Sequence, residues 1–344
     1  MRVLHVTESF GAGVRTAILQ YRKHHWAEHD LLLSLRPEVT RQEVASLGAS
    51  ATVVRGKYSL IRQWLRVRKE AYDVVHAHSS WAGMLVRLIP PRGNTSVVYS
   101  PHGFAFLAAE RPLMGRLVRR VEAALLRRTD AVGAVGSAEA REAQLLNASA
   151  IVRTVPHAVV VPVLPHQLAM SPLRVIAVGR IGYQKNPECV AGLPAYLESV
   201  GLTNVEYVWI GSGDSDRSQL LERGGWTVTG WLSPSEVSEA LAGATVMVHP
   251  ARYEGLPLAV LEAMAHFVPV VVMDIEAFEE VDSVVKASGR AQFYSCAEGL
   301  LQDSTWRTAV SERQLDEISA DFGDAAQSEA LYELYLGAKA RGQR

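Results

Sequence analysis

The feature that most constrains the fold is an alternation of short apolar segments with amphipathic helical patterns along most of the 344 residues. The apolar segments are typical of buried strands, and the patterns between them repeat apolar residues at three- and four-residue spacing. Strands that alternate with helices form a parallel sheet with helices on both faces. In such sheets, ligands bind at the carboxyl ends of the strands.

The alternation is interrupted once, between residues 157 and 172. This segment holds three prolines and has no clear periodicity, so we interpret it as a linker. The predicted fold class is α/β, with two Rossmann-like domains of parallel strands. The predicted parts are an N-terminal domain, the linker, a C-terminal domain and a final helix, at 1–156, 157–172, 173–322 and 323–344.

The individual elements follow from the same patterns. In the N-terminal domain the apolar segments predict strands at Val3–Thr7, Asp30–Ser34, Ala51–Val54, Val74–Ala77, Ser96–Tyr99, Ala131–Val135 and Val152–Val155. In the C-terminal domain they predict strands at Arg174–Val178, Glu206–Ile210, Trp226–Val228, Thr245–His249 and Val268–Met273. The predicted helices include Thr16–His24, Leu60–Glu70, Leu113–Arg128, Pro187–Val200, Ser215–Arg223, Ser233–Ala242, Pro257–His266, Asp303–Ile318 and Asp324–Ala340.

Charge is distributed unevenly along the chain, although the net charge is only −1. Residues 1–170 hold 22 lysines and arginines against 12 aspartates and glutamates, and the remaining residues hold 13 against 24. The asymmetry indicates that the basic half contacts something anionic, unless it serves only to keep each half soluble. A nucleic-acid partner is not expected, because the sequence has neither a basic surface interleaved with aromatic residues nor a known reader motif.

The predicted helix Leu113–Arg128 is strongly basic. We expect its apolar residues to pack on the sheet and its arginines to face solvent. The apolar residues are Leu113, Leu117, Val121, Ala124 and Leu125, and the arginines are Arg116, Arg119, Arg120, Arg127 and Arg128. Together with the basic residues of 62–69, these arginines suit peripheral contact with an anionic membrane surface.

The cellular compartment is predicted from the cysteines and from the apolar runs. The two cysteines, Cys189 and Cys296, lie in no metal-ligand pattern, which indicates a reducing compartment without disulfides. The first residues form a strand pattern rather than a signal peptide, and no apolar run reaches the roughly 20 residues that span a bilayer. We therefore expect a cytoplasmic protein, with peripheral attachment at the inner face of the cytoplasmic membrane as a second expectation.

The stretch 253–264 has the pattern of an anion site. It follows an apolar strand, and Pro257 suits the first position of a helix. The amides of Gly255, Leu256 and Leu258 would then lie at the positive end of the helix dipole, where phosphate binds. Two glutamates, at 254 and 262, would flank a ligand with a phosphate in its middle, as a nucleotide-sugar has. A strand followed by a helix is also ordinary α/β structure, so this stretch alone does not distinguish an anion site from a purely structural segment.

Polar residues and glycines follow several other predicted strands. Arg180 and Lys185 come after one strand of the C-terminal domain, where a diphosphate needs cations. The glycines near these strand ends, which let a ligand approach the backbone, are Gly179, Gly211 and Gly213.

The N-terminal domain offers two further candidates. A glycine turn, Gly11-Ala12-Gly13, follows the first strand, although a single Gly-x-Gly is weak evidence. His102 lies just after another strand and before a glycine, so it either reaches a ligand or bonds within its own loop.

Taken in order, these motifs resemble the family 4 retaining glycosyltransferases of the GT-B fold, also called glycosyltransferase group 1. The segment from Glu254 to Glu262 carries the most specific part of the resemblance, and the segment 4–10 resembles members that build capsular and surface polysaccharides. The resemblance implies two Rossmann-like domains that face each other across a cleft, with a C-terminal helix that returns to the first domain. It also implies an acceptor site mainly on the N-terminal domain and a nucleotide-sugar site mainly on the C-terminal domain.

The resemblance further implies roles for particular residues. Glu262 would bind the ribose hydroxyls of the donor, and Glu254 would lie near the donor sugar. Arg180 and Lys185 would hold the diphosphate as it leaves, and His102 would face the sugar. The catalytic set is therefore Glu254, His102, Arg180 and Lys185. The implied nucleotide-sugar ligands are Gly11, Ala12, Gly13, Gly179, Arg180, Lys185, Gly211, Gly213, Glu254, Gly255, Leu256, Pro257, Leu258 and Glu262.

The expected activity is hexosyl-type transfer, with retention of configuration, from a UDP- or GDP-linked sugar to a glycan or lipid-linked acceptor in bacterial surface polysaccharide synthesis. No cofactor and no metal are expected, since the sequence has no Asp-x-Asp pair. The chain departs from the family pattern in three places, at 156–158, Phe267 and the loop 274–279. The departures leave open a non-catalytic nucleotide-sugar-binding subunit of a glycan assembly complex. Another GT-B enzyme, a phosphorylase or a nucleotide-sugar epimerase, is also an alternative.

Overall fold

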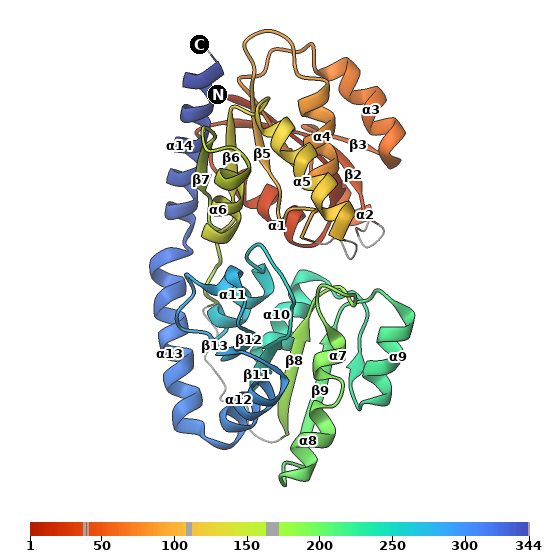
Figure 1. The fold of residues 1–344 in the computed structure, drawn as a ribbon, viewed down its shortest axis with the longest axis vertical. Coiled ribbons are helices and arrows are strands. Elements are labelled where there is room, and N and C mark those ends of the chain that lie inside the picture. Colours follow the sequence, from red (N-terminus) through yellow and green to blue (C-terminus); the bar gives the residue numbers. More distant parts are fainter. Residues whose placement is uncertain (37–38, 40, 108–111, 163–171, 343–344) are drawn as a thin grey trace. The chain divides into compact units, whose positions relative to one another are not determined.

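The computed structural model describes residues 1–36, 39, 41–107, 112–162 and 172–342 (Figure 1). The chain forms two compact units. Unit 1 comprises Met1–Ala158 and Asp324–Arg344, and unit 2 comprises Val159–Gly323. Across the described residues, no helix combines the length and the apolarity needed to cross a bilayer.

Unit 1 contains a seven-stranded parallel sheet with the order β3-β2-β1-β4-β5-β6-β7. The strands are β1 Arg2–Phe10, β2 Glu28–Leu35, β3 Ala51–Val54, β4 Val74–His78, β5 Ser96–Ser100, β6 Ala131–Ala134 and β7 Ile151–Thr154. The helices are α1 Ala12–Tyr21, α2 Arg41–Ala45, α3 Gly56–Val67, α4 Ser80–Leu88, α5 Pro112–Leu126, α6 Ser137–Leu146 and α14 Asp324–Gly342. Each of the seven predicted strands is present, and the predicted α/β class is confirmed.

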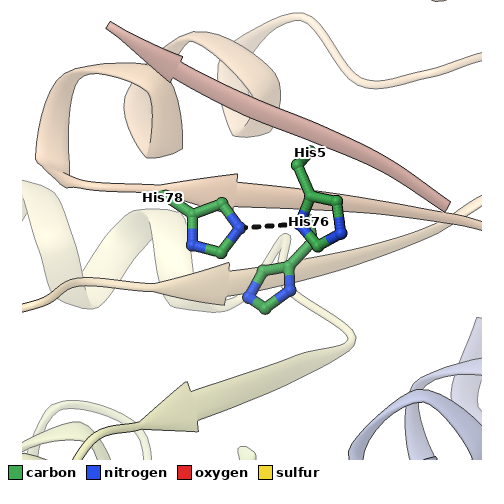
Figure 2. A group of neighbouring side chains, drawn as sticks. All are labelled: His5, His76 and His78. Atoms are coloured by element: carbon green, nitrogen blue, oxygen red, sulfur yellow. Dashed lines mark hydrogen bonds between the residues drawn. The ribbon is translucent and has the colours of Figure 1, made fainter. Parts of the chain in front are cut away.

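Neighbouring residues of each strand face opposite sides of this sheet, so apolar residues are buried on both of its faces. On one side, Val3 of β1 packs with Tyr21 of α1 and Leu331 of α14. On the other side, Leu4 packs with helices α3 to α6, including Trp64. His5, His76 and His78 are fully buried in unit 1 (Figure 2).

Helix α14 completes unit 1 although it is the last element of the chain. Its residues Leu331, Leu334 and Tyr335 are fully buried against strands β5, β6 and β7 and neighbouring elements. The amide of Gln327 donates to the carbonyl of Pro156 at 2.8 Å, and the indole of Trp26 donates to a serine of α14 at 3.0 Å. The helix is therefore an integral part of the hydrophobic core of unit 1.

Unit 2 contains a six-stranded parallel sheet with the order β10-β9-β8-β11-β12-β13. The strands are β8 Leu173–Val178, β9 Val205–Ile210, β10 Thr227–Val228, β11 Val246–His249, β12 Val270–Met273 and β13 Val285–Ala287. The helices are α7 Pro187–Val190, α8 Leu193–Ser199, α9 Ser215–Arg223, α10 Pro234–Ala242, α11 Leu258–Ala265, η1 Glu276–Phe278, α12 Arg290–Gln302 and α13 Ser304–Asp321. Strand β13 was not predicted, because it is three residues long and has a lysine at its centre.

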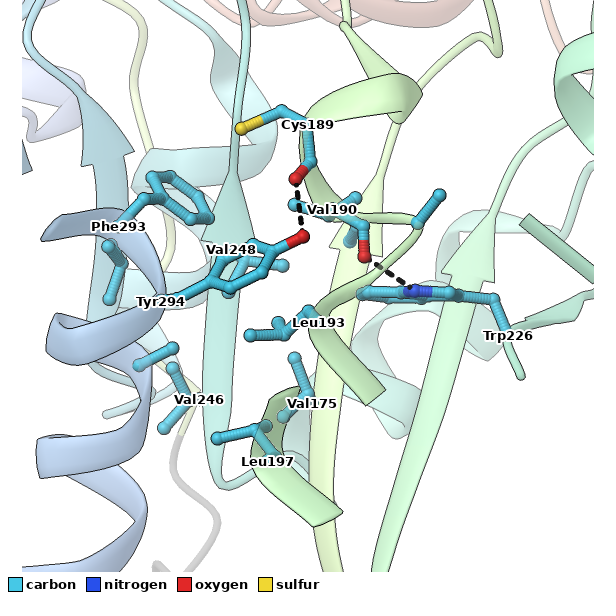
Figure 3. Packing of buried hydrophobic residues seen from close by; sticks show 14 of the residues in the cluster. Val175, Cys189, Val190, Leu193, Leu197, Trp226, Val246, Val248, Phe293 and Tyr294 are labelled. Carbon is cyan, nitrogen blue, oxygen red and sulfur yellow. Dashed lines mark hydrogen bonds between the residues drawn. The ribbon is translucent and has the colours of Figure 1, made fainter. Parts of the chain in front are cut away.

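The core of unit 2 joins the sheet to α7, α8 and α12 (Figure 3). Phe293 is fully buried there, and the hydroxyl of Tyr294 donates to the carbonyl of Cys189 at 2.9 Å. The single helix predicted over Pro187–Val200 is wrong, since it is divided into α7 and α8. The reason is local: Pro194 lies in the first turn of α8, where a missing amide is tolerated, but it would interrupt a continuous helix.

The predicted orientation of α5 is also wrong. Leu113 is 78% exposed, Leu117 is 55% exposed and Val121 is 43% exposed, so the expected apolar stripe does not pack on the sheet. Helix α5 instead buries the face that carries Glu122 and Leu126. Four of the five residues of the predicted stripe, all but Leu125, are thus exposed on unit 1 together with arginines of the same helix.

A buried ion pair explains this orientation. One oxygen of Glu122 lies 2.9 Å from Nη2 of Arg87 on α4, and both side chains are almost fully buried. The guanidinium of Arg87 also lies over the ring of Tyr99, 3.8 Å from its centroid. A carboxylate can be buried at this place only because a cation from another helix accompanies it.

Candidate functional site

The loop after β8 is built so that Lys185 folds back on the strand end. Gly179 has φ +145°, and a Cβ at this position would lie 2.7 Å from Cε of Lys185. Only glycine therefore fits beside this lysine without a shift. Arg180, the next residue, is exposed, and within the described part of the chain it has no ion-pair or hydrogen-bond partner for its side chain.

The two glycines after β9 have a structural requirement of their own. A Cβ at Gly211 would lie 2.2 Å from the carbonyl oxygen of Gly179, and one at Gly213 would lie 2.0 Å from that of Ile181. The backbones of the two strand-end loops therefore approach each other more closely than any side chain permits. The packing of the protein alone accounts for these glycines, whether or not a ligand lies on them.

Glu254 lies within a cluster of polar groups in unit 2. Its Oε1 lies 2.6 Å from Nζ of Lys185 and 3.4 Å from Nε2 of His249, and its Oε2 accepts from the amide of Gln184 at 3.0 Å. Burial acts to raise the pKa of Glu254, but the charge of Lys185 and the bond with His249 outweigh it and lower the pKa to about 2. Glu254 is therefore ionised and paired before any ligand binds.

Gln184 and His249 were not predicted from the sequence as site residues. Both had a usable signal, because Gln184 adjoins the predicted Lys185 and His249 is a polar residue at the carboxyl end of an apolar strand. The loop that departs from the family pattern contributes to the same place. Phe278 of η1 is fully buried, and its ring meets that of His249 edge-on at 5.9 Å between centroids.

Helix α11 begins at Leu258, one residue later than predicted. Pro257 is its N-cap residue with ψ 115°, so the proline is extended rather than helical. The first-turn amides therefore belong to Leu258 and Ala259, and they have no preceding helical carbonyl to bond. Gly255 and Leu256, also predicted as ligands, are buried just before the helix.

Glu262 lies on α11 and differs from Glu254 in its surroundings. Burial raises the pKa of Glu262 to about 7. Its carboxyl group has no hydrogen-bond or ion-pair partner among the described residues. A partly buried carboxyl with a raised pKa and no partner is a candidate ligand contact.

Phe267, a departure from the family pattern, follows the last turn of α11 with φ 61°. Helices commonly end in this left-handed conformation, and glycine is favoured there because it has no Cβ. Glycine would therefore suit this helix end, and the phenylalanine adopts the same backbone at a cost of about 1 kcal/mol.

Unit 1 holds the other predicted residues. Helix α1 begins at Ala12, earlier than the predicted Thr16, so the turn 11–13 supplies its first amides. A Cβ at Gly13 would contact nothing within 4 Å, so packing does not require glycine there. The open space leaves room for a ligand to approach this helix end.

His102 follows β5 with φ 51°, a strained value for a residue with a side chain. Its Nε2 lies 3.0 Å from Nδ1 of His78 on β4, so the alternative of a bond within its own loop is wrong. Burial lowers the pKa of His102 to about 3, with a smaller contribution from His157. His102 is therefore a neutral imidazole at ordinary pH.

The structure thus brings Lys185 and Glu254 into direct contact and places Gly179 beside them. Among the described residues, Arg180 forms no hydrogen bond or ion pair with either of them. His102 and the turn 11–13 lie in unit 1, and the remaining predicted residues lie in unit 2.

Comparisons with known proteins identify the family. Residues 22–161 match the model of Glycosyltransferase Family 4, and residues 172–303 match the model of Glycosyl transferases group 1. A 41.2 kDa protein of the cps region of Klebsiella pneumoniae is 21% identical over 82% of this chain and 84% of its own length. The Escherichia coli UDP-Gal:alpha-D-GlcNAc-diphosphoundecaprenol alpha-1,3-galactosyltransferase is 24% identical over 67% of this chain and 65% of its own length.

Solved structures show the same architecture. The crystal structure of Anabaena Alr3699/HepE in complex with UDP and glucose matches with a TM-score of 0.80 and 14% identity, over 97% of this chain and 98% of that protein. At this identity the likeness concerns the fold alone, which is GT-B. The two family models together cover most of the chain, and the chain therefore belongs to the group 1, family 4 glycosyltransferases.

Proposed function

We propose that the protein transfers a hexose, with retention of configuration, from a nucleoside-diphosphate sugar to a glycan or lipid-linked acceptor in bacterial surface polysaccharide synthesis. The observation that carries the proposal is the partly buried carboxyl of Glu262, which has no partner among the described residues. Ribose hydroxyls would supply the missing donors. The names of the relatives support the setting, since one lies in a cps region and another uses UDP-galactose.

The charges of unit 2 suit a departing diphosphate. Arg180 is exposed and unpaired within the described residues, and Lys185 is held at the end of the same strand. The first amides of α11 would add hydrogen-bond donors. Fixed cations and amides stabilise charge where it develops, so we propose a reaction that needs no metal and no cofactor.

We propose the reaction that the resemblance to the retaining family implies. The acceptor hydroxyl attacks the anomeric carbon from the side on which the diphosphate leaves, and its proton passes to a diphosphate oxygen. The bond between sugar and phosphate breaks as the new glycosidic bond forms, so the configuration is kept. We propose that Glu254 and His102 contact the sugar and that UDP or GDP is the leaving group.

Glu262→Gln provides the test of the proposed nucleotide site. Hydrogen bonds from two ribose hydroxyls favour the ionised carboxylate, whose pKa in the free protein is about 7. Affinity for UDP or GDP should therefore fall as the pH is lowered below 7, by up to about tenfold per unit. In Glu262→Gln the affinity should be about 10- to 100-fold weaker and nearly independent of pH. Isothermal titration calorimetry from pH 5.5 to 8 measures both effects.

The same variant should also be more stable than the wild type at pH 8. The pKa of Glu262 is raised from 4.5 to about 7 in the folded chain, so the folded state loses stability as the pH rises through this range. Glutamine removes this cost, on the order of 3 kcal/mol at pH 8 and under about 1 kcal/mol at pH 5. Glu239 is an exposed glutamate of the same unit, so Glu239→Gln is the control. It should change neither the nucleotide affinity nor the stability. Unchanged affinity in Glu262→Gln would overturn the site.

We also propose that α5 attaches the enzyme to an anionic membrane, on the cytoplasmic side where the acceptor is made. Its exposed apolar stripe, Leu113, Leu117 and Val121, is the observation that supports this. Arg116 and Arg120 are exposed on the same helix, and Arg127 and Arg128 are exposed directly after it. The side chains of these four arginines have no partner among the described residues. Arg119 is different, because it pairs with Glu142 at 3.2 Å. An apolar stripe beside unpaired cations is the pattern of an interfacial helix.

Leu113→Ser combined with Leu117→Ser should reduce binding to vesicles that contain phosphatidylglycerol by at least about tenfold, because each leucine contributes about 1.5–3 kcal/mol when buried. Arg120→Gln with Arg127→Gln should reduce it by a similar factor and weaken its dependence on salt. Cosedimentation measures both. Leu336→Ser, which alters a 45% exposed leucine of α14, is the matched control. An equal loss of vesicle binding in Leu336→Ser would contradict attachment through α5. Equal binding of the wild type to neutral and to anionic vesicles would contradict it as well.

A further inference from the structure

Four histidines form a continuous hydrogen-bonded chain across the sheet of unit 1. Nε2 of His102 lies 3.0 Å from Nδ1 of His78, and Nε2 of His78 lies 2.9 Å from Nδ1 of His5. Nε2 of His5 lies 2.9 Å from Nδ1 of His29, whose own Nε2 lies 3.4 Å from the carbonyl oxygen of His24. The chain therefore starts after β5 and passes through β4 and β1 to β2, in the order of neighbouring strands. Figure 2 shows the link between His5 and His78.

The imidazoles of this chain are neutral. Burial lowers the pKa of His5 and His78 well below the ordinary value, and it lowers the pKa of His29 to about 4. A neutral imidazole carries one N–H donor and one acceptor nitrogen. Each ring must therefore donate in one direction along the chain and accept from the other.

The carbonyl of His24 fixes that direction, because a carbonyl oxygen can only accept. His29 must then carry its proton on Nε2 and accept at Nδ1. By the same step, His5 and His78 each carry the proton on Nε2 and accept at Nδ1. His102 is consequently required to donate from Nε2, which leaves the lone pair of its Nδ1 unused by the chain.

The conformation of His102 is held from a second side. The amide of Gly103 donates to Oε1 of Glu139 at 2.6 Å, which fixes the loop directly after the strained histidine. His102 is partly exposed, whereas the three histidines behind it are buried. The free lone pair thus belongs to the outermost ring of the chain.

We propose that His78, His5 and His29 are positioning residues that hold His102 in its Nε2–H tautomer, so that Nδ1 accepts a hydrogen bond from a hydroxyl of the bound sugar. The identification of the sugar hydroxyl as the donor rests on the proposed function, whereas the tautomer of His102 follows from the histidine chain alone. Loss of one hydroxyl hydrogen bond corresponds to a change of about threefold to tenfold in KM for the donor.

A metal site is the competing interpretation, because nitrogens of His5, His76 and His78 all lie within 4.8 Å of one another. The hydrogen bonds argue against it. Nδ1 of His76 lies 2.9 Å from the hydroxyl of Tyr335, and its Nε2 lies 2.9 Å from Oγ of Ser100. Both nitrogens of His5 and of His78 are used by the chain. A metal would have to displace several of these bonds.

His76 also provides the matched control, because it is as buried as the chain but is not one of its links. Its ring lies 4.0 Å from that of His78 between centroids. Other titratable groups near the histidine chain are Tyr21, Arg22, Asp30 and His157. His29→Leu removes the end of the chain, three links away from His102, while His76→Leu removes a comparable buried ring.

The experiment is long-range proton–nitrogen NMR of the full-length protein labelled with ¹⁵N-histidine, at pH 7.5. In the wild type, His102 should show one tautomer, with a protonated Nε2 and an unprotonated Nδ1. His29→Leu should give a mixture of tautomers at His102 and raise KM for the donor by about threefold to tenfold. His76→Leu should leave the tautomer and KM unchanged, even if its melting temperature falls as far as that of His29→Leu.

The Nδ1–H tautomer in the wild type would overturn the proposal, and this result needs no variant to fold. Equal effects of His29→Leu and His76→Leu would also overturn it, as would stoichiometric binding of Zn²⁺ with loss of the His5 and His78 signals. The predicted tautomer in a protein that binds no nucleotide-sugar would support the chain and refute the proposed function alone.

Discussion

Lys185→Ala should lower the rate of sugar transfer by about 10²- to 10³-fold, the usual effect of removing one group that stabilises developing charge. Lys185 is held at the end of β8 by Glu254, at 2.6 Å, and its side chain is only 16% exposed. A cation fixed in this way needs no rearrangement when the diphosphate leaves. The assay is release of UDP or GDP from a nucleotide-sugar that the wild type turns over, with the anomer of the product read by NMR.

The loss of rate in Lys185→Ala must be distinguished from an effect of lower stability. Without Lys185, the carboxylate of Glu254 stays buried with only Gln184 and His249 nearby, so its pKa should rise from about 2. Adding Glu254→Gln removes this unpaired charge and should restore stability without restoring the rate. Addition of EDTA should leave the wild-type rate unchanged. Because Glu254 is itself proposed to contact the sugar, the double variant reports on stability alone. A rate of Lys185→Ala that falls only in proportion to its folded fraction would show that the lysine is only structural.

Glu122→Ala should destabilise unit 1 by about 3–5 kcal/mol, because it leaves Arg87 buried and unpaired. Arg87 is fully buried, and the ion pair with Glu122 at 2.9 Å is its charged contact. For a unit of this size, the melting temperature should fall by roughly 10 °C. Calorimetry of the whole chain, with nucleotide added to mark the transition of unit 2, measures the change.

Two controls accompany this prediction. Arg87→Met combined with Glu122→Leu replaces both charges by apolar groups of similar size, and it should recover most of the lost stability. Leu117→Ala alters the exposed side of the same helix and should change stability by at most about 0.5 kcal/mol. If Leu117→Ala were as destabilising as Glu122→Ala, the orientation of α5 in the structure would be wrong.

The order of strands and helices was predictable because each element has its own local pattern. The bounds of β3 and α9 agree with the prediction at both ends. The face of α5 was not predictable in the same way. Its alternative apolar stripe is continuous in sequence, whereas the burial of Glu122 depends on Arg87, 35 positions earlier on another helix. The buried face of α5 is therefore determined by a contact with another helix, and the spacing of residues along α5 does not reveal that contact.

The candidate site shows the same limit. Arg180, Lys185 and Glu254 were found because each lies at a strand end or helix start, which local patterns reveal. The contact between Lys185 and Glu254 was not predicted, because the two residues are 69 positions apart in the sequence. The histidine chain depends on the alignment of neighbouring strands, for example of His5 with His76, and on rings from four separate segments. A single sequence does not specify these alignments.

Helix α14 has a consequence for how the chain acquires its structure during synthesis. Residues 1–158 leave the ribosome before 324–342, yet they need that helix to cover Val3 and Tyr21. Until it arrives, His76 lacks the hydroxyl of Tyr335 and an apolar face of unit 1 stays open. Translation of unit 1 therefore starts before that of unit 2 but is completed after it. Unit 2 can fold while residues 1–158 still expose an apolar face, a state that favours aggregation.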